Sequence, residues 1–150
     1  MASKVRGLLS MTMLLAGACG DFVEAGDDRA LVTLGTQGGA IEFRELRLDV
    51  PAGALARTVN LEVTSTPAGH VSHDYHLGPA GVTFDVTTSI AIRYDQATQG
   101  PANELFILDL SRDPLHPLPG RVVEAQEIRA HVSGAGRFAV VRCPRGVCGQ

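Results

Sequence analysis

The residue types best suited to chemistry are three of the five histidines, His70, His73 and His76, which are spaced three residues apart. Imidazole is the commonest protein ligand of Zn²⁺ and Cu²⁺, and the carboxylate of Asp74 would add an oxygen ligand. In a loop the three rings could converge on one metal ion. On a strand, a spacing of three places His70 and His73 on opposite faces, which prevents convergence. We therefore expect a solvated polar loop leading into a strand, with no metal and no cofactor, and a metal site is the alternative.

Cysteines supply the next candidates, because the chain has three of them, an odd number for an exported protein. If Cys19 carries a lipid, Cys143 and Cys148 remain as a pair, which would oxidise in an exported protein. Pro144 and Gly146 can turn the chain between them. A lone C-x4-C pair supplies only two of the about four ligands that structural zinc requires. Redox pairs usually have the C-x-x-C spacing. We expect a disulfide between Cys143 and Cys148.

Motifs of the common enzyme classes are missing from the sequence. It contains no G-x-S-x-G, no phosphate-binding glycine loop and no H-E-x-x-H. The carboxylates Glu104, Asp109 and Asp113 show no pairing that would justify acid–base catalysis. The net charge of −3 argues against a nucleic-acid partner bound by a basic face, and 5% aromatic residues without Trp disfavour stacking platforms. The sequence thus indicates neither an enzyme nor a nucleic-acid-binding protein.

Residues 1–18 are typical of a lipoprotein signal peptide. Two basic residues within the first six are followed by the uncharged apolar run 7–17, which is too short to span a membrane. The sequence L-A-G-A-C at 15–19 resembles the lipobox of bacterial lipoproteins, in which the cysteine is lipidated and becomes the first residue. The A-G-A at 16–18 also fits an ordinary cleavage site, which would give simple secretion.

Lipidation of Cys19 would place the protein in the bacterial cell envelope, anchored to the membrane through its N-terminal lipid. Residues 19–29 are acidic and without periodicity, and we expect them to form a tether. Gly20 follows the cysteine directly, with Asp21 one place later, which favours the outer over the inner membrane.

The elements that must position these residues are strands, because apolar and polar residues alternate with period two from residue 30 onward. The predicted strands are 41–43, 46–50, 59–63, 82–86, 90–92 and 138–141. Residues 105–110 are apolar on both faces, as in a central strand, and 122–132 fits a strand pair. With glycine- and proline-rich turns between them, about eight to nine short strands predict an all-β antiparallel sandwich over 30–142. We expect residues 143–150 to form a C-terminal cysteine loop.

Three segments carry a family resemblance: G-G-A at 38–40, L-D-V-P-A-G-A-L at 48–55 and G-P-A-G-V-T-F at 78–84. In this order they resemble the ZU-five domain, a β-sandwich of ankyrins, netrin receptors and zonula occludens proteins, over residues 31–141. The resemblance implies a β-sandwich with a structural or protein-interaction role and an unknown envelope protein as partner.

Some ZU-five relatives cleave themselves at a His-Phe-Ser sequence, and His131, Val132 and Ser133 occupy that place here. The resemblance therefore implies an alternative in which Ser133 attacks the preceding peptide carbonyl and His131 acts as base. The main hypothesis is a non-catalytic, lipid-anchored structural or interaction module, with a strand end at Ser133. A self-cleaving or metal-binding sandwich is the alternative.

Overall fold

The chain forms twelve strands in the computed structural model, which describes residues 21–25, 28–68, 71–94, 101–144 and 148. The strands are β1 (Asp21–Ala25), β2 (Arg29–Leu34), β3 (Gly39–Phe43), β4 (Leu46–Val50), β5 (Val59–Thr66), β6 (Asp74–Gly78), β7 (Thr83–Arg93), β8 (Leu105–Asp109), β9 (His116–Pro117), β10 (Val122–Glu124), β11 (Glu127–Gly134) and β12 (Gly136–Arg142). One 3₁₀ turn, η1 (Ala102–Glu104), precedes β8. Across the described ranges, no helix has the length and apolar character needed to cross a bilayer.

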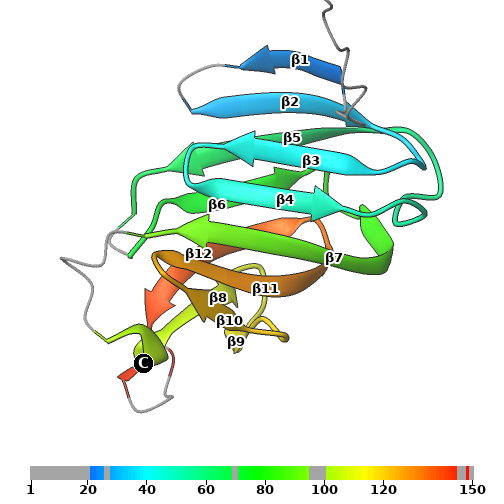
Figure 1. The fold of residues 1–150 in the computed structure, drawn as a ribbon. Helices are drawn as coiled ribbons and strands as arrows, with labels where there is room; N and C mark the ends of the chain where they lie inside the picture. The colour runs from blue at the N-terminus through cyan, green and yellow to red at the C-terminus, as the bar shows by residue number, and fades with distance from the viewer. Residues whose placement is uncertain (1–20, 26–27, 69–70, 95–100, 145–147, 149–150) are drawn as a thin grey trace, which may run out of the picture.

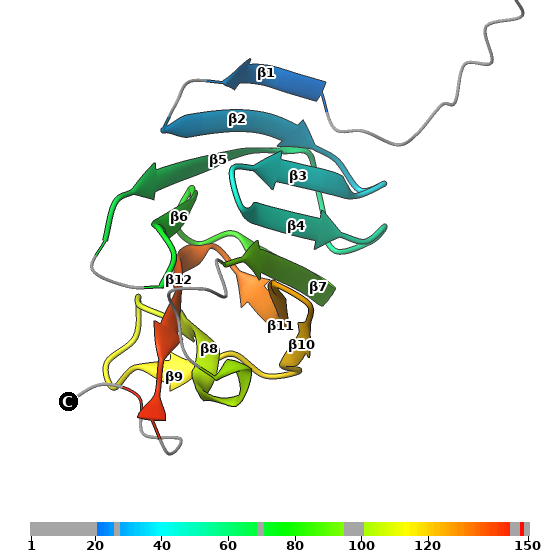
Figure 2. The ribbon, with the colours of Figure 1, turned by 60° about the vertical axis from the view of Figure 1, so that its left-hand side comes forward.

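The strands form two antiparallel sheets. Seven strands follow the order β1-β2-β5-β6-β12-β8-β9, and five follow the order β10-β11-β7-β4-β3. Figure 1 shows the five-stranded sheet in front of β5, β6 and β12, and Figure 2 shows the two layers from another side. The predicted all-β sandwich is confirmed.

The core lies between the sheets and is filled by the residues that the alternation points inward. In β4, Leu46 and Leu48 are buried whereas Arg47 between them is exposed. Leu48 stands opposite Ile41 of β3 on one side and Ile90 of β7 on the other. Burial of such side chains contributes about 1.5–3 kcal/mol each, which holds the two sheets together.

The glycine pair at 38–39 and the V-P-A-G sequence at 50–53 lie against each other in the structure. Gly38 has φ of +71°, and a Cβ on this residue would collide with the backbone of Val50 and Pro51. Only glycine accepts both the left-handed conformation and this close approach. The glycine at position 38 is therefore required by the close approach of the backbone at Val50 and Pro51.

The N-terminal tether expected over 19–29 is corrected by the structure, because residues 21–25 form β1. This strand pairs with β2, with Phe22 opposite Val32 and Ala25 opposite Ala30. Without β1, the outer edge of β2 would present unpaired N–H and C=O groups. Main-chain pairing depends little on side-chain alternation, which is why the acidic sequence concealed this strand.

The segment 105–110, predicted to be a central strand, forms β8, which is flanked by β12 and by the two-residue β9. The prediction attributed the burial of both faces to a central position in the sheet, whereas in the structure the chain after β8 covers the outer face. The outward-facing Leu108 is fully buried, and the chain after β8 returns so that the Leu118 N–H donates to the Ile107 carbonyl (2.9 Å). The guanidinium of Arg121 lies 4.4 Å from the centre of the Phe106 ring. A returning loop, rather than neighbouring strands, covers this face.

The predicted strands 82–86 and 90–92 are parts of one strand, β7. Its ladder with β11 is interrupted where residues 84–87 stand opposite Ser133. There the Asp85 N–H donates to the Ala54 carbonyl instead (2.9 Å). The pair predicted over 122–132 is confirmed as β10 and β11.

Candidate functional site

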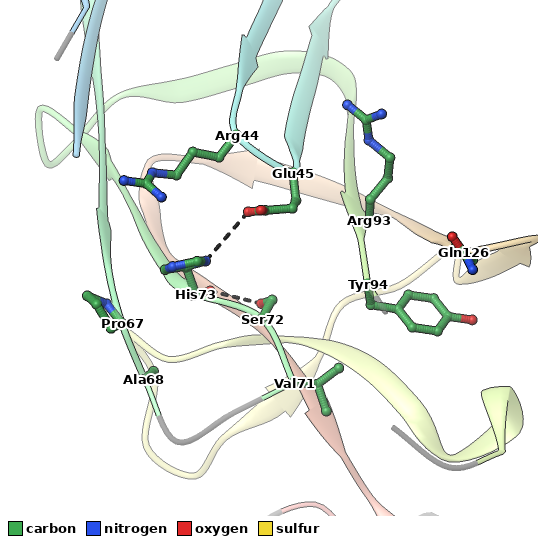
Figure 3. A pocket seen from close by; sticks show the side chains of 10 residues that line it. All are labelled: Arg44, Glu45, Pro67, Ala68, Val71, Ser72, His73, Arg93, Tyr94 and Gln126. Atoms are coloured by element: carbon green, nitrogen blue, oxygen red, sulfur yellow. Dashed lines mark hydrogen bonds and ion pairs between the residues drawn. The ribbon is translucent and has the colours of Figure 1, made fainter. Parts of the chain in front are cut away.

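A cavity of about 670 Å³ opens at one end of the sandwich. It lies where β3, β5 and β7 end and where β4, β6 and β11 begin. Its lining comes from the β3–β4 turn, the β5–β6 connection, the end of β7 and the β10–β11 turn (Figure 3). Connections held on a rigid framework are common places for binding sites.

The polar centre of this cavity is Glu45, in the two-residue turn between β3 and β4. The Tyr75 hydroxyl donates a hydrogen bond to Glu45 Oε2 (2.5 Å), and His73 Nδ1 lies 3.5 Å from the same oxygen. Tyr75 is fully buried and belongs to the seven-stranded sheet, whereas Glu45 belongs to the five-stranded sheet. The cluster of Glu45, Tyr75 and His73 therefore links the two sheets across the mouth of the sandwich.

These contacts separate the pKa values of the two acidic groups. Burial alone would raise the pKa of Glu45, but the Tyr75 hydrogen bond, the backbone and the charges of His73 and Arg44 together lower it. For Tyr75, burial raises the pKa first, and the hydrogen bond and negative charge of Glu45 raise it further. At neutral pH, Glu45 is ionised and Tyr75 is a neutral donor.

Local geometry explains how Glu45 reaches this position. Phe43 and Leu46 pair across the hairpin, so Arg44 and Glu45 form a two-residue loop. Arg44 has φ of 54°, a left-handed conformation that two-residue hairpin loops require and that is uncommon outside glycine. The Glu45 carbonyl accepts a hydrogen bond from the Arg93 N–H (2.9 Å), which ties the turn to β7.

The walls of the cavity are fixed by hydrogen bonds to the sheets. Ser72 Oγ donates to the His73 carbonyl (2.8 Å) and accepts from the Val140 N–H of β12 (2.9 Å). The Val71 N–H donates to the Val140 carbonyl (3.1 Å). Tyr94 is buried, and its N–H donates to the Gln126 carbonyl (2.9 Å). The main chain around the cavity is thus held by the same hydrogen bonds that hold the sheets.

The structure separates the histidines considered as metal ligands. His73 faces Glu45 just before β6, whereas His76 within β6 is exposed and stands opposite Thr64. His70 lies outside the described residues. In the part of the chain that the structure describes, no three His, Cys, Asp or Glu side chains are grouped so that they could hold a metal ion.

Sequence reasoning missed Glu45, Tyr75 and Tyr94. Tyr75 lies between two of the histidines singled out, but its partner Glu45 is 30 residues earlier in the chain. The only local signal is that the pair Arg44 and Glu45 interrupts the alternation between Phe43 and Leu46. That signal predicts a turn and says nothing of what the turn contacts.

His131 and Ser133 line a second cavity, of about 610 Å³, beside the interruption between β7 and β11. Both residues are exposed. The ring of His131 lies against Gly120. The main-chain N–H of His131 donates to the Pro119 carbonyl (2.8 Å). Within the described ranges, no hydrogen bond joins the His131 and Ser133 side chains. Self-cleavage at this place stays a prediction.

The C-terminal cysteines are close enough to be bridged. Cys143 and Cys148 are joined as a disulfide, with 4.4 Å between their Cα atoms, as the sequence predicted. Cys143 is fully buried, and its N–H donates to the Glu104 carbonyl (2.7 Å). The loop is therefore attached to the start of β8. Cys19 and the signal peptide expected over residues 1–18 lie outside the described residues.

Comparison with known proteins adds no relative: no family model matches the chain, and no curated protein matches it either. The fold and the cavity define the class of protein as an all-β sandwich domain with a preformed cavity at one end of the sheets.

Proposed function

We propose that this protein is a lipid-anchored, ZU-five-like domain of the bacterial cell envelope that acts as a structural or protein-interaction module. The observation that carries the proposal is the cavity at the end of the sandwich, framed by connections from both sheets. Concave surfaces between loops on a rigid scaffold are typical of recognition sites.

The ionisation of the cavity's polar cluster supports binding rather than acid–base catalysis. A general acid or base works best with a pKa near the operating pH. The pKa of Glu45 is lowered and that of Tyr75 is raised, so both move away from neutrality. The two side chains satisfy each other and hold the turn in place.

Strand register supports a defined orientation at the membrane. Asp21, two residues after Cys19, stands opposite Thr33 of β2, and Thr33 stands opposite Asn60 near the start of β5. The cavity lies at the other end of β5, an eight-residue strand that spans about 26 Å. Figure 1 shows β1 and β5 running toward the same end of the sandwich. A lipid on Cys19 would therefore hold one end at the membrane and present the cavity away from it.

Fractionation combined with site-specific crosslinking tests the proposal. A photo-crosslinking residue is placed at Gln126, on the cavity rim, and separately at the exposed Thr36, in the turn at the opposite end. We expect a defined adduct from position 126 and none from position 36, with the protein in the membrane fraction. Soluble wild-type protein with unmodified Cys19, or adducts from neither position, would overturn the proposal.

A further inference from the structure

Each sheet ends in two edge strands, and among the described strands β3 has the least protected edge. β9 has two residues, and its Pro117 has no N–H to donate. β10 has three residues, and the pairing of β1 with β2 is irregular between Phe22 and Glu24. Natural proteins protect sheet edges by shortness, proline and irregularity of these kinds. β3, in contrast, has five residues in unbroken register with β4 and no proline.

Strand register shows which main-chain groups of β3 point toward β4. Successive residues of a strand turn their N–H and C=O groups to opposite sides, so every second residue bonds to the same neighbour. The Glu45 carbonyl accepts a hydrogen bond from the Arg93 N–H on the β7 side of β4. The next residue, Leu46, therefore turns its groups toward β3, where Phe43 stands opposite it. Phe43 and Ile41 thus bond to β4.

Ala40 and Glu42 turn their main-chain groups the other way, toward the open edge. Their two N–H and two C=O groups make no hydrogen bond within the described part of the chain. Both residues are exposed. An extended segment laid antiparallel beside β3 would pair with all four groups, as peptides do when they add a strand to a sheet.

The layer behind β3 favours a single strand over a second copy of the chain. Figures 1 and 2 both show β2 and β1 of the seven-stranded sheet extending past β3, on the side away from β4. A second copy paired through β3 would continue the five-stranded sheet, so its own seven-stranded sheet would have to lie where β1 and β2 already lie. A single extended segment adds one strand to the front layer and meets no such obstacle.

The exposed face beside this edge favours a basic residue in the added strand. Arg47 pairs with Glu42 (2.9 Å) and also with Asp49 (2.9 Å), so one guanidinium serves two carboxylates. The Glu42 side chain is 67% exposed and belongs to the edge strand, where an added strand would place a side chain directly opposite it. Opposite charges in such cross-strand pairs are stabilising.

The inward face of β3 favours apolar residues in the added strand. Ile41 and Phe43 are buried in the core. The inward residues of β2 are also apolar and buried: Ala30, Val32 and Leu34. Inward side chains of an added strand would point toward the same layer, because strand residues alternate between the two faces.

We propose that the edge of β3 binds an extended segment of another protein as an additional antiparallel strand. The segment alternates apolar inward residues with polar outward residues, and it places a lysine or arginine opposite Glu42. Main-chain pairing with Ala40 and Glu42 supplies the binding, and the cross-strand charge pair supplies selectivity. This interaction surface goes beyond the cavity role proposed above and does not depend on it.

NMR-detected amide hydrogen exchange of the purified full chain tests this inference, with acetyl-Val-Lys-Val-Thr-Val-amide as the probe. In the antiparallel arrangement the probe's lysine stands opposite Glu42 and its threonine opposite Ala40. Without the peptide, the Ala40 and Glu42 amides should exchange faster than those of Ile41 and Phe43, which bond to β4. With about nine-tenths of the chain bound, exchange at Ala40 and Glu42 should slow about tenfold, because it then proceeds from the unbound fraction.

Two altered peptides separate main-chain pairing from charge. Methylation of the lysine and threonine amide nitrogens removes the donors to the Glu42 and Ala40 carbonyls, and it should abolish the slowing. Replacement of the lysine by glutamate should weaken binding about fivefold or more, because like charges then stand opposite each other.

Variants of the chain test the same two contributions. Ala40→Pro removes an edge N–H that no described hydrogen bond uses, and it should abolish peptide binding. Glu42→Gln should weaken binding of the lysine peptide about two- to fivefold. The matched control is Glu127→Gln, because Glu127 pairs with Arg129 in β11, which β4 and β7 separate from β3, and affinity should not change. If Ala40→Pro fails to fold, the methylated peptide still decides the test.

Equal slowing by the methylated peptide, or no slowing at Ala40 and Glu42, would overturn the inference. A dimer in light scattering that Ala40→Pro dissociates would also overturn it, because the edge would then hold a second copy. In either case the cavity role stands if the position-126 adduct still forms. Slowing at β3 without that adduct would leave this inference standing while the proposed cavity role fails.

Discussion

Replacing Tyr75 by Phe isolates the hydrogen bond that links the two sheets. Tyr75 is fully buried, and Phe fills the same space except for the hydroxyl, so no large cavity is created. The change removes the donor to Glu45 Oε2. A hydrogen bond to a charged group contributes about 1.5–3 kcal/mol. Because Glu45 is 45% exposed and water can replace part of the lost donor, we expect a loss of about 1–2 kcal/mol at pH 7.

The pH dependence of this loss gives a sharper test. The folded-state pKa of Glu45 lies below its ordinary value of 4.5, so ionised Glu45 contributes stability that is complete above that value. This contribution is lost as the pH falls through the folded-state pKa. Removing the Tyr75 donor moves the pKa of Glu45 back toward its ordinary value. The stability difference between wild type and variant should therefore be largest at neutral pH and should shrink toward pH 3.

Urea unfolding between pH 3 and pH 8 measures both effects, and Tyr94→Phe is the matched control. Among the described residues, the acceptor of the Tyr94 hydroxyl is the neutral carbonyl of Ala125, at 3.4 Å. Its loss should therefore cost less and should not vary over this pH range. A Tyr75→Phe variant as stable as wild type at pH 7 would refute the reasoning. A difference as large at pH 3 as at pH 7 would show that the charge of Glu45 plays no part.

Three further predictions concern the framework and the anchor. Gly38→Ala should lower stability by more than 1 kcal/mol in urea unfolding, because the new methyl group meets the Val50 carbonyl and the left-handed φ is unfavourable for alanine. Thiol counting on denatured, unreduced protein should find neither Cys143 nor Cys148 reactive, and two reactive thiols at these positions would contradict the disulfide. Cys19→Ser should move the protein from the membrane to the soluble fraction with an unchanged melting temperature, because about two acyl chains are needed for stable attachment. A variant that stays with the membrane would show that another part of the chain attaches it.

Sequence alone was sufficient to predict the fold class and most strands, because the alternation of apolar and polar residues lies within each strand. In β4 and β11 the inward residues alternate with exposed arginines, and this period of two identifies both the strand and its buried face. The turn at Gly38 and the disulfide between Cys143 and Cys148 were also predictable, since both depend on residues with narrow conformational or chemical roles.

Tertiary structure decided what depends on partners far apart in the chain. β1 exists because the open edge of β2 offers main-chain groups, and such pairing leaves little trace in the side chains. β8 is buried on both faces because a later segment returns over it, an effect that resembles a central strand when read locally. Glu45 and Tyr75 meet because β4 and β6 belong to different sheets whose ends coincide. Local periodicity specifies which face of a strand is buried, but it does not specify which distant residues that face will contact.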